Sequence, residues 1–452
     1  MNVCQTVPPI YCGGAFWRGE EMTKWRVCIF MADYFKMSGE ERLSELQQLR
    51  KAYEEYQSKQ LQLDMSRGKP CTEQLELSMD MLNPIDYHTE TGFDSRNYGV
   101  LEGLPEARRF FAELLDVQPE EIIVGGNSSL QMMYYLIDLG CRRGFVDSPR
   151  PWSQEETVKF ICPVPGYDRH FRVTEYFGFE LLRVDMTENG PDMDAVEKLV
   201  KDPAVKGIWC VPLYSNPDGY VYSDETVRRL ASMKTAAPDF KIIWDDAYCV
   251  HHLTDEPQHT LNILQECRKA GNELRPLIQC STSKITFPGA GVSAVAADEK
   301  NVAYILKNMM PMLISYDKMN QLRHVRYLKN KQGVLEHMKK HRAILQPKFE
   351  LVKDTLQSRL APCGNIAWWT DPKGGYFISL YVENGCAKRI VQLCKEAGVV
   401  LTGAGAAYPK DYDPDDHHIR IAPSYPTLDE LKIASELLTI CVRIAVLEKL
   451  TK

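Results

Sequence analysis

The sequence predicts an α/β protein whose main domain is a mostly parallel sheet of seven strands between helices. Short apolar runs recur along the middle of the chain, and most of them are separated by segments with helical patterns or helix caps. This alternation is typical of parallel sheets that carry helices on both faces. The seven predicted strands are 122–124, 160–162, 180–184, 205–211, 241–244, 277–280 and 291–297.

Helical patterns lie before, between and after these strands. Residues 38–60 begin with Ser38, a good helix cap, and repeat leucine on one stripe. Residues 99–117 are amphipathic, and residues 128–139 are apolar nearly all round, which predicts a helix buried inside the domain. Residues 317–353 are predicted as one long helical segment. A strand-like stretch at 367–380, a helix near 387–397 and a strand at 419–421 then predict an α+β part.

The change of pattern after about residue 314 predicts a division into domains. Residues 96–316 are predicted as the large domain, and residues 37–95 and 317–452 as two parts of a smaller one. Residues 1–36 lack the basic start, long apolar middle and cleavage site of a signal peptide. They are predicted to be a poorly ordered N-terminal extension ahead of Met37.

Composition excludes several classes of protein. The 452 residues are 44% hydrophobic and carry a net charge of −7, which argues against a general nucleic-acid or membrane-surface binder. No apolar run approaches the roughly 20 residues that span a bilayer. The 14 cysteines show no CxxC pair, so they predict reduced thiols in a cytoplasmic protein and no metal site.

Polar residues follow five successive predicted strands. Ligands of open parallel sheets bind beyond the carboxyl ends of the strands, so these five exits are expected to meet at one site. They supply glycines, amides, hydroxyls, an acid, a phenol and an amine, a set that fits a phosphorylated, cationic, planar aldehyde better than a nucleotide. The exits are 125–129, 163–167, 214–219, 245–248 and 281–284.

Two of these residues indicate the chemistry. Lys284 follows hydroxyl residues just beyond an apolar strand, which suits an amine that reacts. Asp245 ends another apolar strand, which suits a fixed counter-charge for a cationic ring. Each residue also has an ordinary structural role as an alternative: Asp245 as a helix cap, Lys284 as a surface lysine and Tyr167 as a core tyrosine. Such structural roles explain single residues, but they do not readily explain why all five strand exits carry polar residues of this kind in this order.

The motifs Asp-x-Ala-Tyr at 245–248 and Ser-x-Ser-Lys at 281–284 resemble those of the class I, fold-type I pyridoxal-phosphate aminotransferases. From about residue 43 onward the chain is similar to the bacterial aspartate aminotransferase subgroup Ic. The resemblance implies a fold-type I transferase with pyridoxal 5'-phosphate as cofactor. It also implies a homodimer with active sites at the interface, moving an amino group from an L-amino acid, best L-aspartate, to a 2-oxo acid, best 2-oxoglutarate.

The resemblance also implies roles for single residues. Lys284 corresponds to the lysine that forms the Schiff base with the cofactor, and Asp245 to the partner of the ring nitrogen. Tyr248 and Asn216 would contact the ring oxygen, and Tyr167 would stack on the ring.

The remaining implied contacts concern the phosphate and the substrate. Tyr98 resembles the tyrosine that reaches the phosphate of the neighbouring subunit. Gly68 corresponds to a glycine of the substrate lid, and Arg420 to the arginine that binds the substrate α-carboxylate. The implied phosphate ligands of the same subunit are Gly126, Asn127, Ser128 and Ser281.

Two departures from the family pattern stand out. Class I enzymes carry a phosphate-binding arginine about eight residues after the lysine, whereas residues 285–293 contain none. Lys318 and Arg323 are candidates to supply that charge. No residue matches the arginine that reads the distal carboxylate of aspartate, so the substrate preference is less firmly implied than the reaction.

Three other functions remain as alternatives. A pyridoxal-phosphate lyase or decarboxylase would use the same fold. A regulator that binds the same cofactor would need a basic winged-helix domain, for which the N-terminal region is too short. A nicotinamide dehydrogenase is disfavoured because the turn at 125–129 is not a GxGxxG motif.

Overall fold

The computed structural model describes residues 33–452, so residues 1–32 of the predicted extension lie outside the described part. The last residues of that extension are folded. Tyr34 is 2% exposed, and its hydroxyl accepts a hydrogen bond from Arg443 Nε at 2.7 Å. The prediction of a poorly ordered extension is therefore wrong for residues 33–36, because Tyr34 completes a hydrophobic core.

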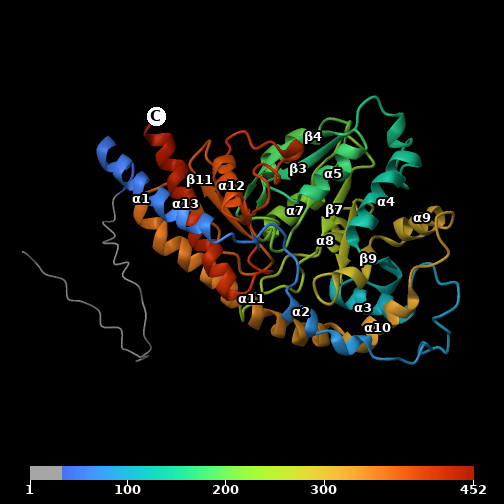
Figure 1. Cartoon of the computed structure of the whole chain (residues 1–452). Coiled ribbons are helices and arrows are strands. Elements are labelled where there is room, and N and C mark those ends of the chain that lie inside the picture. Colours follow the sequence, from blue (N-terminus) through green and yellow to red (C-terminus); the bar gives the residue numbers. More distant parts are fainter. Residues whose placement is uncertain (1–32) are drawn as a thin grey trace, which may run out of the picture.

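The large sheet has the order β2-β9-β8-β7-β6-β3-β4-β5, and each of the seven predicted strands is present in it (Figure 1). The additional strand, β5, is a two-residue edge. β9 runs antiparallel to both neighbours and β5 antiparallel to β4, whereas the other pairs are parallel. The strands are β2 (Ile122–Val124), β3 (Lys159–Val164), β4 (Glu180–Thr187), β5 (Gly190–Pro191), β6 (Val205–Cys210), β7 (Lys241–Asp245), β8 (Pro276–Ser281) and β9 (Ser293–Ala296).

Helices cover both faces of this sheet, as predicted. Strand side chains alternate between two hydrophobic cores; on β7, Ile243 joins one core and its neighbour Ile242 the other. The core that contains Ile243 packs against α4 (Ser129–Arg142), α5 (Asp168–Tyr176) and α9 (Glu299–Met309). The opposite core packs against α3 (Pro105–Leu115), α6 (Met193–Leu199), α7 (Asp224–Ser232) and α8 (Ile263–Lys269).

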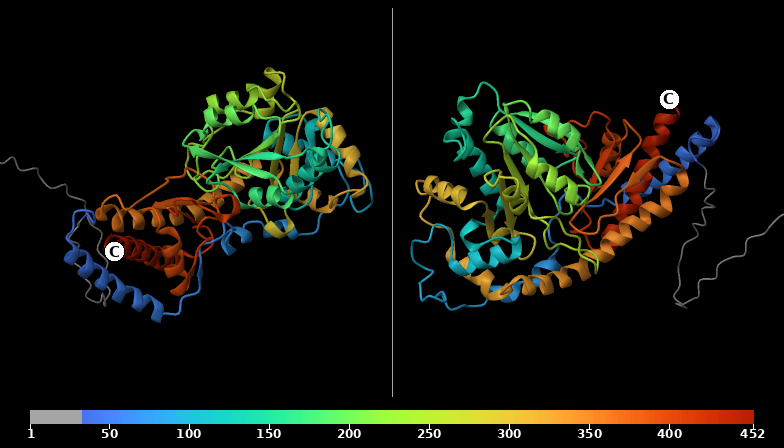
Figure 2. Two further views of the ribbon diagram at one scale, coloured as in Figure 1. Left: turned by 90° about the horizontal axis from the view of Figure 1, so that it is seen from above. Right: turned by 180° about the vertical axis from the view of Figure 1, so that it is seen from behind.

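A second lobe holds both ends of the described chain (Figure 2). Its antiparallel sheet has the order β10-β11-β13, and a separate parallel pair joins β1 to β12. α1 and α13 lie side by side, and α1 begins with the predicted cap, because Ser38 and Glu41 form a capping box. The elements are α1 (Gly39–Ser58), β1 (Leu63–Asp64), β10 (Ala367–Trp369), β11 (Ile378–Val382), α12 (Ala387–Glu396), β12 (Val399–Val400), β13 (His418–Ile421) and α13 (Leu428–Leu450).

One long helix joins the lobes along one side of the molecule, and a shorter helix of the large lobe precedes it (Figures 1 and 2). The single helical segment predicted over 317–353 is instead α10 (Lys318–Leu328) and α11 (Lys331–Arg359), separated at Lys329, whose φ of 65° interrupts the helix. α11 crosses from one core to the other, since Val334 lies in a core of the large sheet and Phe349 in that of the second lobe. Because α11 packs in both lobes, the core packing does not define a boundary at 316/317, and this boundary stays a prediction.

Other segments correct the predicted boundaries. The helix expected over 99–117 begins only at Pro105, because Gly99, Val100 and Gly103 have positive φ angles. The strand expected over 367–380 is a hairpin of β10 and β11, turned near Gly375, whose φ is 81°. Short helical segments are α2 (Thr72–Glu76), Met79–Leu82, Pro119–Glu121, Trp152–Gln154, Pro288–Ala290, Ala361–Cys363 and Pro409–Asp411. Among the helices of residues 33–452, none has the length and apolar character to cross a membrane.

Candidate active site

Asp245 and Lys284 lie at the same edge of the large sheet. Asp245 ends β7, and Lys284 follows β8, its parallel neighbour. The carboxyl ends of parallel strands meet at one edge, so the structure brings these two predicted residues together. The Asp245 carboxylate favours the charged form of the Lys284 amine and so opposes part of the lowering of the Lys284 pKa by burial.

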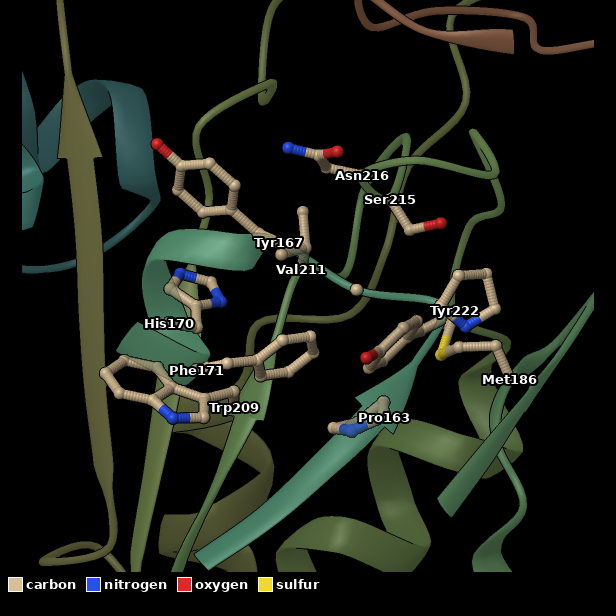
Figure 3. Close-up of a pocket in the computed structure, with 12 residues that line it drawn as sticks. Pro163, Tyr167, His170, Phe171, Met186, Trp209, Val211, Ser215, Asn216 and Tyr222 are labelled. Carbon is tan, nitrogen blue, oxygen red and sulfur yellow. The ribbon is translucent and has the colours of Figure 1, made fainter. Parts of the chain in front are cut away.

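Asp245 is held by a histidine that the sequence analysis did not single out. Asp245 is 3% exposed, and its Oδ2 lies 3.0 Å from His170 Nε2. The His170 ring stacks on Trp209 with centroids 4.5 Å apart and 6° between the planes. Figure 3 shows His170 between Trp209 and Tyr167. The sequence could have indicated His170, because it lies three residues after Tyr167. Residues at this spacing in a helix lie on the same face.

The other oxygen of Asp245, Oδ1, is buried without a hydrogen-bond partner among the described residues. A buried carboxylate oxygen without a partner is costly, and an N–H donor on a ligand would satisfy it. The cavity of Figure 3, bordered by Tyr167, His170 and Asn216, measures about 20 Å³, which is room for a water molecule and not for a substrate. The unpaired Oδ1 atom of Asp245 therefore indicates a ligand site more clearly than this small cavity does.

Lys284 has an amine whose protonation is disfavoured by its surroundings. Burial lowers the pKa of Lys284, and the nearby Asp245 opposes that change. Its Nζ lies 4.9 Å from the centre of the Tyr248 ring. Burial raises the pKa of Tyr248 well above its usual value, with Tyr167 and Asp245 adding to the rise. Lys284 is thus suited to act as a nucleophile or base, and Tyr248 to stay a hydrogen-bond donor.

A buried polar network contacts the main chain at Ile285, the residue after Lys284, and stabilises that segment. His337 Nε2 lies 2.9 Å from the carbonyl oxygen of Ile285, and 3.1 Å from His341 Nε2. Gln74 Nε2 lies 2.9 Å from His341 Nδ1. Burial lowers the pKa of both histidines, so they serve as neutral hydrogen-bonding groups. No local motif in the sequence predicts this network, because its members come from distant segments.

Arg420 and Asn216 form one hydrogen-bonded unit. Arg420 Nη1 donates to Asn216 Oδ1 at 3.2 Å, and it also lies 3.3 Å from Asp168 Oδ1. Arg420 Nη2 donates to Thr402 Oγ1 at 3.3 Å. Because the Asn216 oxygen faces the guanidinium, its Nδ2 group is the one left to donate elsewhere. Arg420 Nε is buried and has no partner in residues 33–452, which leaves a donor for a carboxylate ligand.

Gly68 packs against Phe377, whose ring lies beside the same arginine. A Cβ atom at Gly68 would come within 2.5 Å of Phe377 Cζ, so only glycine allows this close approach. The ring of Phe377 lies 4.6 Å from the Arg420 guanidinium carbon. Thr402, which accepts from Arg420, donates to the carbonyl oxygen of Ser66 at 2.6 Å. The predicted substrate-lid segment is therefore anchored beside Arg420.

The glycine-containing turn at 125–129 opens helix α4, as predicted. Ser128 occupies the N-cap position, but its side chain makes no capping hydrogen bond. The first N–H groups of the helix therefore lack a side-chain cap and can bind an anion. Ser283 Oγ donates to the carbonyl oxygen of Asn127 at 2.9 Å, which ties the turn to the lysine segment. Ser281 is buried at the end of β8, at the same edge of the sheet as Gly126.

Tyr98 stands apart from the other predicted residues. Its side chain is 76% exposed, and its only hydrogen bond joins its backbone N–H to Asn97 Oδ1 within the described chain. The family resemblance implies that this tyrosine reaches the site of a neighbouring subunit. That role stays a prediction.

A group of possible metal ligands lies outside this site. Asp413, Asp415 and His417 place one ligand atom each within 4.8 Å of one another. Asp413 Oδ2 already accepts from the backbone N–H groups of His417 and His418, at 2.8 and 3.0 Å. These bonds organise the loop that leads into β13, so the cluster has a structural explanation.

Comparisons with known proteins place this geometry in a family. Residues 37–452 match the family model described as aspartate amino-transferase. An aspartate aminotransferase of Corynebacterium glutamicum is 47% identical over 88% of this chain and 93% of its own length. The crystal structure of an aspartate transaminase from C. glutamicum superposes with a TM-score of 0.90 at 45% identity, covering 93% of this chain and 99% of that chain.

A more distant structure shares only the fold. LysN, an α-aminoadipate aminotransferase of Thermus thermophilus complexed with N-(5'-phosphopyridoxyl)-L-leucine, is 20% identical, with a TM-score of 0.68 over 92% of this chain and 97% of that chain. The family match covers both lobes and every predicted site residue. The chain therefore belongs to the aspartate aminotransferase family, and it is a fold-type I transaminase.

Proposed function

We propose that this transaminase uses pyridoxal 5'-phosphate to move the amino group of L-aspartate to 2-oxoglutarate. The observation that carries the proposal is the environment of Asp245, which has one carboxylate oxygen on His170 and the other without a partner. A protonated pyridine nitrogen is a donor that would satisfy this oxygen. When bound, the cofactor supplies an aldehyde that combines with amines and a cationic ring that withdraws electrons from Cα.

The side chains around Asp245 fit that cofactor. The uncapped end of α4 and the hydroxyl of Ser281 would bind a phosphate. The Asn216 Nδ2 group and the Tyr248 hydroxyl would donate to a ring oxygen, since Asn216 Oδ1 is engaged by Arg420. These roles agree with those that the family resemblance implies.

Lys284 would move the proton that transamination requires. Its lowered pKa increases the neutral fraction of the amine, which can take a proton from Cα of the substrate and deliver it to the cofactor. Arg420 would hold the α-carboxylate, because a guanidinium fork binds a carboxylate through two parallel hydrogen bonds. Gly68 and its neighbours would close over that carboxylate and exclude water.

Separate observations support the proposed oligomer and compartment. The exposed Tyr98 supports a homodimer in which its hydroxyl reaches the partner's cofactor phosphate. The cysteines of the described part are free thiols, which supports a reducing, cytoplasmic location. Heterodimers of the Lys284→Ala and Tyr98→Ala variants test the shared site. Mixing should recover activity that neither variant has alone, and no recovery would exclude the exchange of Tyr98.

A donor and acceptor screen tests the substrates. Purified holoenzyme is incubated with each amino acid and 2-oxo acid, and mass spectrometry identifies the products. L-aspartate with 2-oxoglutarate should give oxaloacetate and glutamate as the fastest reaction. Formation of alanine, pyruvate or ammonia from aspartate alone would instead support a lyase or decarboxylase on the same fold.

A further inference from the structure

The proposed cofactor carries a phosphate dianion, and an uncapped helix end alone does not neutralise it. The macrodipole supplies about half an elementary charge at a helix N-terminus. The eighth residue after Lys284 is Val292, which is buried and cannot supply a positive charge. A cation from another part of the chain is therefore needed near Gly126 and Asn127.

A cavity of about 210 Å³ lies directly against that turn. One wall is formed by 125–127 at the start of α4, and another by 289–292, which includes Val292. The third wall comes from α10 and contains Asp317, Asn320 and Arg323. Arg323 is the cation in this lining, so the turn and a guanidinium share one cavity.

The guanidinium of Arg323 is not used by the rest of the described chain. Its Nε is buried without a hydrogen-bond partner, and no salt bridge joins Arg323 to another residue of 33–452. Lys318, the other candidate from the sequence, differs in both respects. Its Nζ donates to Ser315 Oγ at 2.7 Å, and it does not line the cavity. The structure thus separates two candidates that the sequence left equal.

Asp317 is the opposing charge in the cavity wall. Its Oδ1 accepts from the backbone N–H of Asn320 at 3.0 Å, which makes Asp317 the N-cap of α10. A capping carboxylate is partly compensated by the helix end that it binds. Since Asp317 does not pair with Arg323, the arginine stays available to an anion.

We infer that Arg323 binds the phosphate group of the cofactor, opposite the N–H groups of the turn at 125–127. The inference rests on the proposed function, because it assigns a residue to the same cofactor site. Arg323 lies on α10 and not on the strand that follows Lys284. The phosphate would therefore be held between α10 and the turn that opens α4. The guanidinium fork suits phosphate because it can donate two hydrogen bonds at once.

The test separates the phosphate from the rest of the cofactor. Apoenzyme is titrated with pyridoxal 5'-phosphate and with pyridoxal, which lacks the phosphate, and binding is followed by absorbance. Arg323→Gln should raise the Kd of pyridoxal 5'-phosphate about 10- to 100-fold, the effect of losing hydrogen bonds to a charged group. The Kd of pyridoxal should stay unchanged, and inorganic phosphate should lose its competition with the cofactor.

Arg326→Gln is the matched control, because Arg326 is exposed on the same helix and donates to the carbonyl oxygen of His88. It should leave both Kd values unchanged, and Arg323→Lys should recover part of the phosphate-dependent affinity. Equal weakening of both ligands by Arg323→Gln, or no weakening, would overturn the inference. Failure of the wild-type protein to bind either ligand would instead overturn the proposed function.

Discussion

The amino and carboxyl ends of the large sheet both bury charged side chains, but the lysines at the amino end are paired with carboxylates, whereas charged groups at the carboxyl end keep atoms without partners. There Lys206 Nζ lies 3.1 Å from Asp239 Oδ1 and 3.2 Å from Glu155 Oε1. Lys241 Nζ lies 2.7 Å from Asp147 Oδ1 and donates to the carbonyl oxygen of Leu274 at 2.8 Å. Lys206 and Lys241 therefore each have a carboxylate partner inside the protein.

At the carboxyl end, and on the elements that pack around it, some buried atoms of charged groups have no partner. Asp245 Oδ1, Arg420 Nε and Arg323 Nε are buried without partners among residues 33–452. Such groups lose hydration without gaining an internal hydrogen bond, which destabilises the fold. A ligand with the complementary charges would offset that cost. The lysines at the amino end thus form structural ion pairs, whereas the incompletely paired groups near Asp245 mark the proposed binding site.

The largest expected effect concerns Lys284 at the carboxyl end. Lys284→Ala should lower turnover at least about 10³-fold, because both proton transfer and covalent binding of the cofactor are lost. Thermal stability of the apoenzyme should not fall, since a desolvated amine has been removed. Turnover and the borohydride-reduced peptide mass are the measurements. Lys340→Ala, at an exposed position, is the control, and turnover within tenfold of wild type in Lys284→Ala would contradict its assigned role.

The corresponding change at the amino end should affect stability and not chemistry. Lys206→Met leaves the fully buried Asp239 without its cation and should cost about 3–5 kcal/mol of unfolding free energy. Urea denaturation of the apoenzyme measures this loss. The kcat per folded molecule should equal that of wild type. If stability were unchanged and kcat fell, the distinction between the two ends would be wrong.

Asp245→Asn should act on chemistry alone. Removing the fixed negative charge should lower kcat by about 10²- to 10³-fold, the usual cost of losing one preorganised electrostatic group. Stability of the apoenzyme should hold or rise, because an incompletely paired carboxylate is replaced by a neutral amide. Steady-state kinetics and thermal melting are compared. A change in KM with normal kcat would show that Asp245 does not act on the reacting cofactor.

Arg420→Lys should mainly weaken substrate binding. The ammonium keeps the charge but loses the fork, so KM for the amino acid should rise about 10- to 100-fold, as for lost hydrogen bonds to a charged group. The kcat should change less than KM. Arg389→Lys is a control far from the site, where Arg389 pairs with Glu448. Equal losses in kcat and in kcat/KM would contradict a binding role.

The last expected effect is a pH dependence of stability at Asp246. Burial, with Asp245 beside it, raises the pKa of Asp246 to about 7 from 3.8. The folded state therefore binds this proton more tightly than the unfolded state, so stability from this group declines as pH rises from 3.8 to about 7 and then levels. Asp246→Asn should be more stable than wild type by a margin that grows over this range. A margin independent of pH would exclude the shift.

Local sequence patterns were sufficient to predict the strands of the large sheet and the polar residues that follow them. The strands before Asp245 and Lys284 are short apolar runs with clear turn signals, and such signals lie within a few residues of each other. The same reasoning failed where local patterns are ambiguous. The segment 317–353 is helix-prone as a whole, but Lys329 has a positive φ and Asn330 caps a second helix, so the segment is two helices.

Packing of distant segments decided the rest of the site. His170 and Asp245 are 75 positions apart, and Arg420 and Asn216 are 204 apart, so no window of sequence contains either pair. Arg323 was one of two equal candidates until the position of α10 brought it, and not Lys318, to the cavity beside Gly126. Periodicity depends on neighbouring residues, whereas pairing of buried charges depends on which elements the folded core brings together.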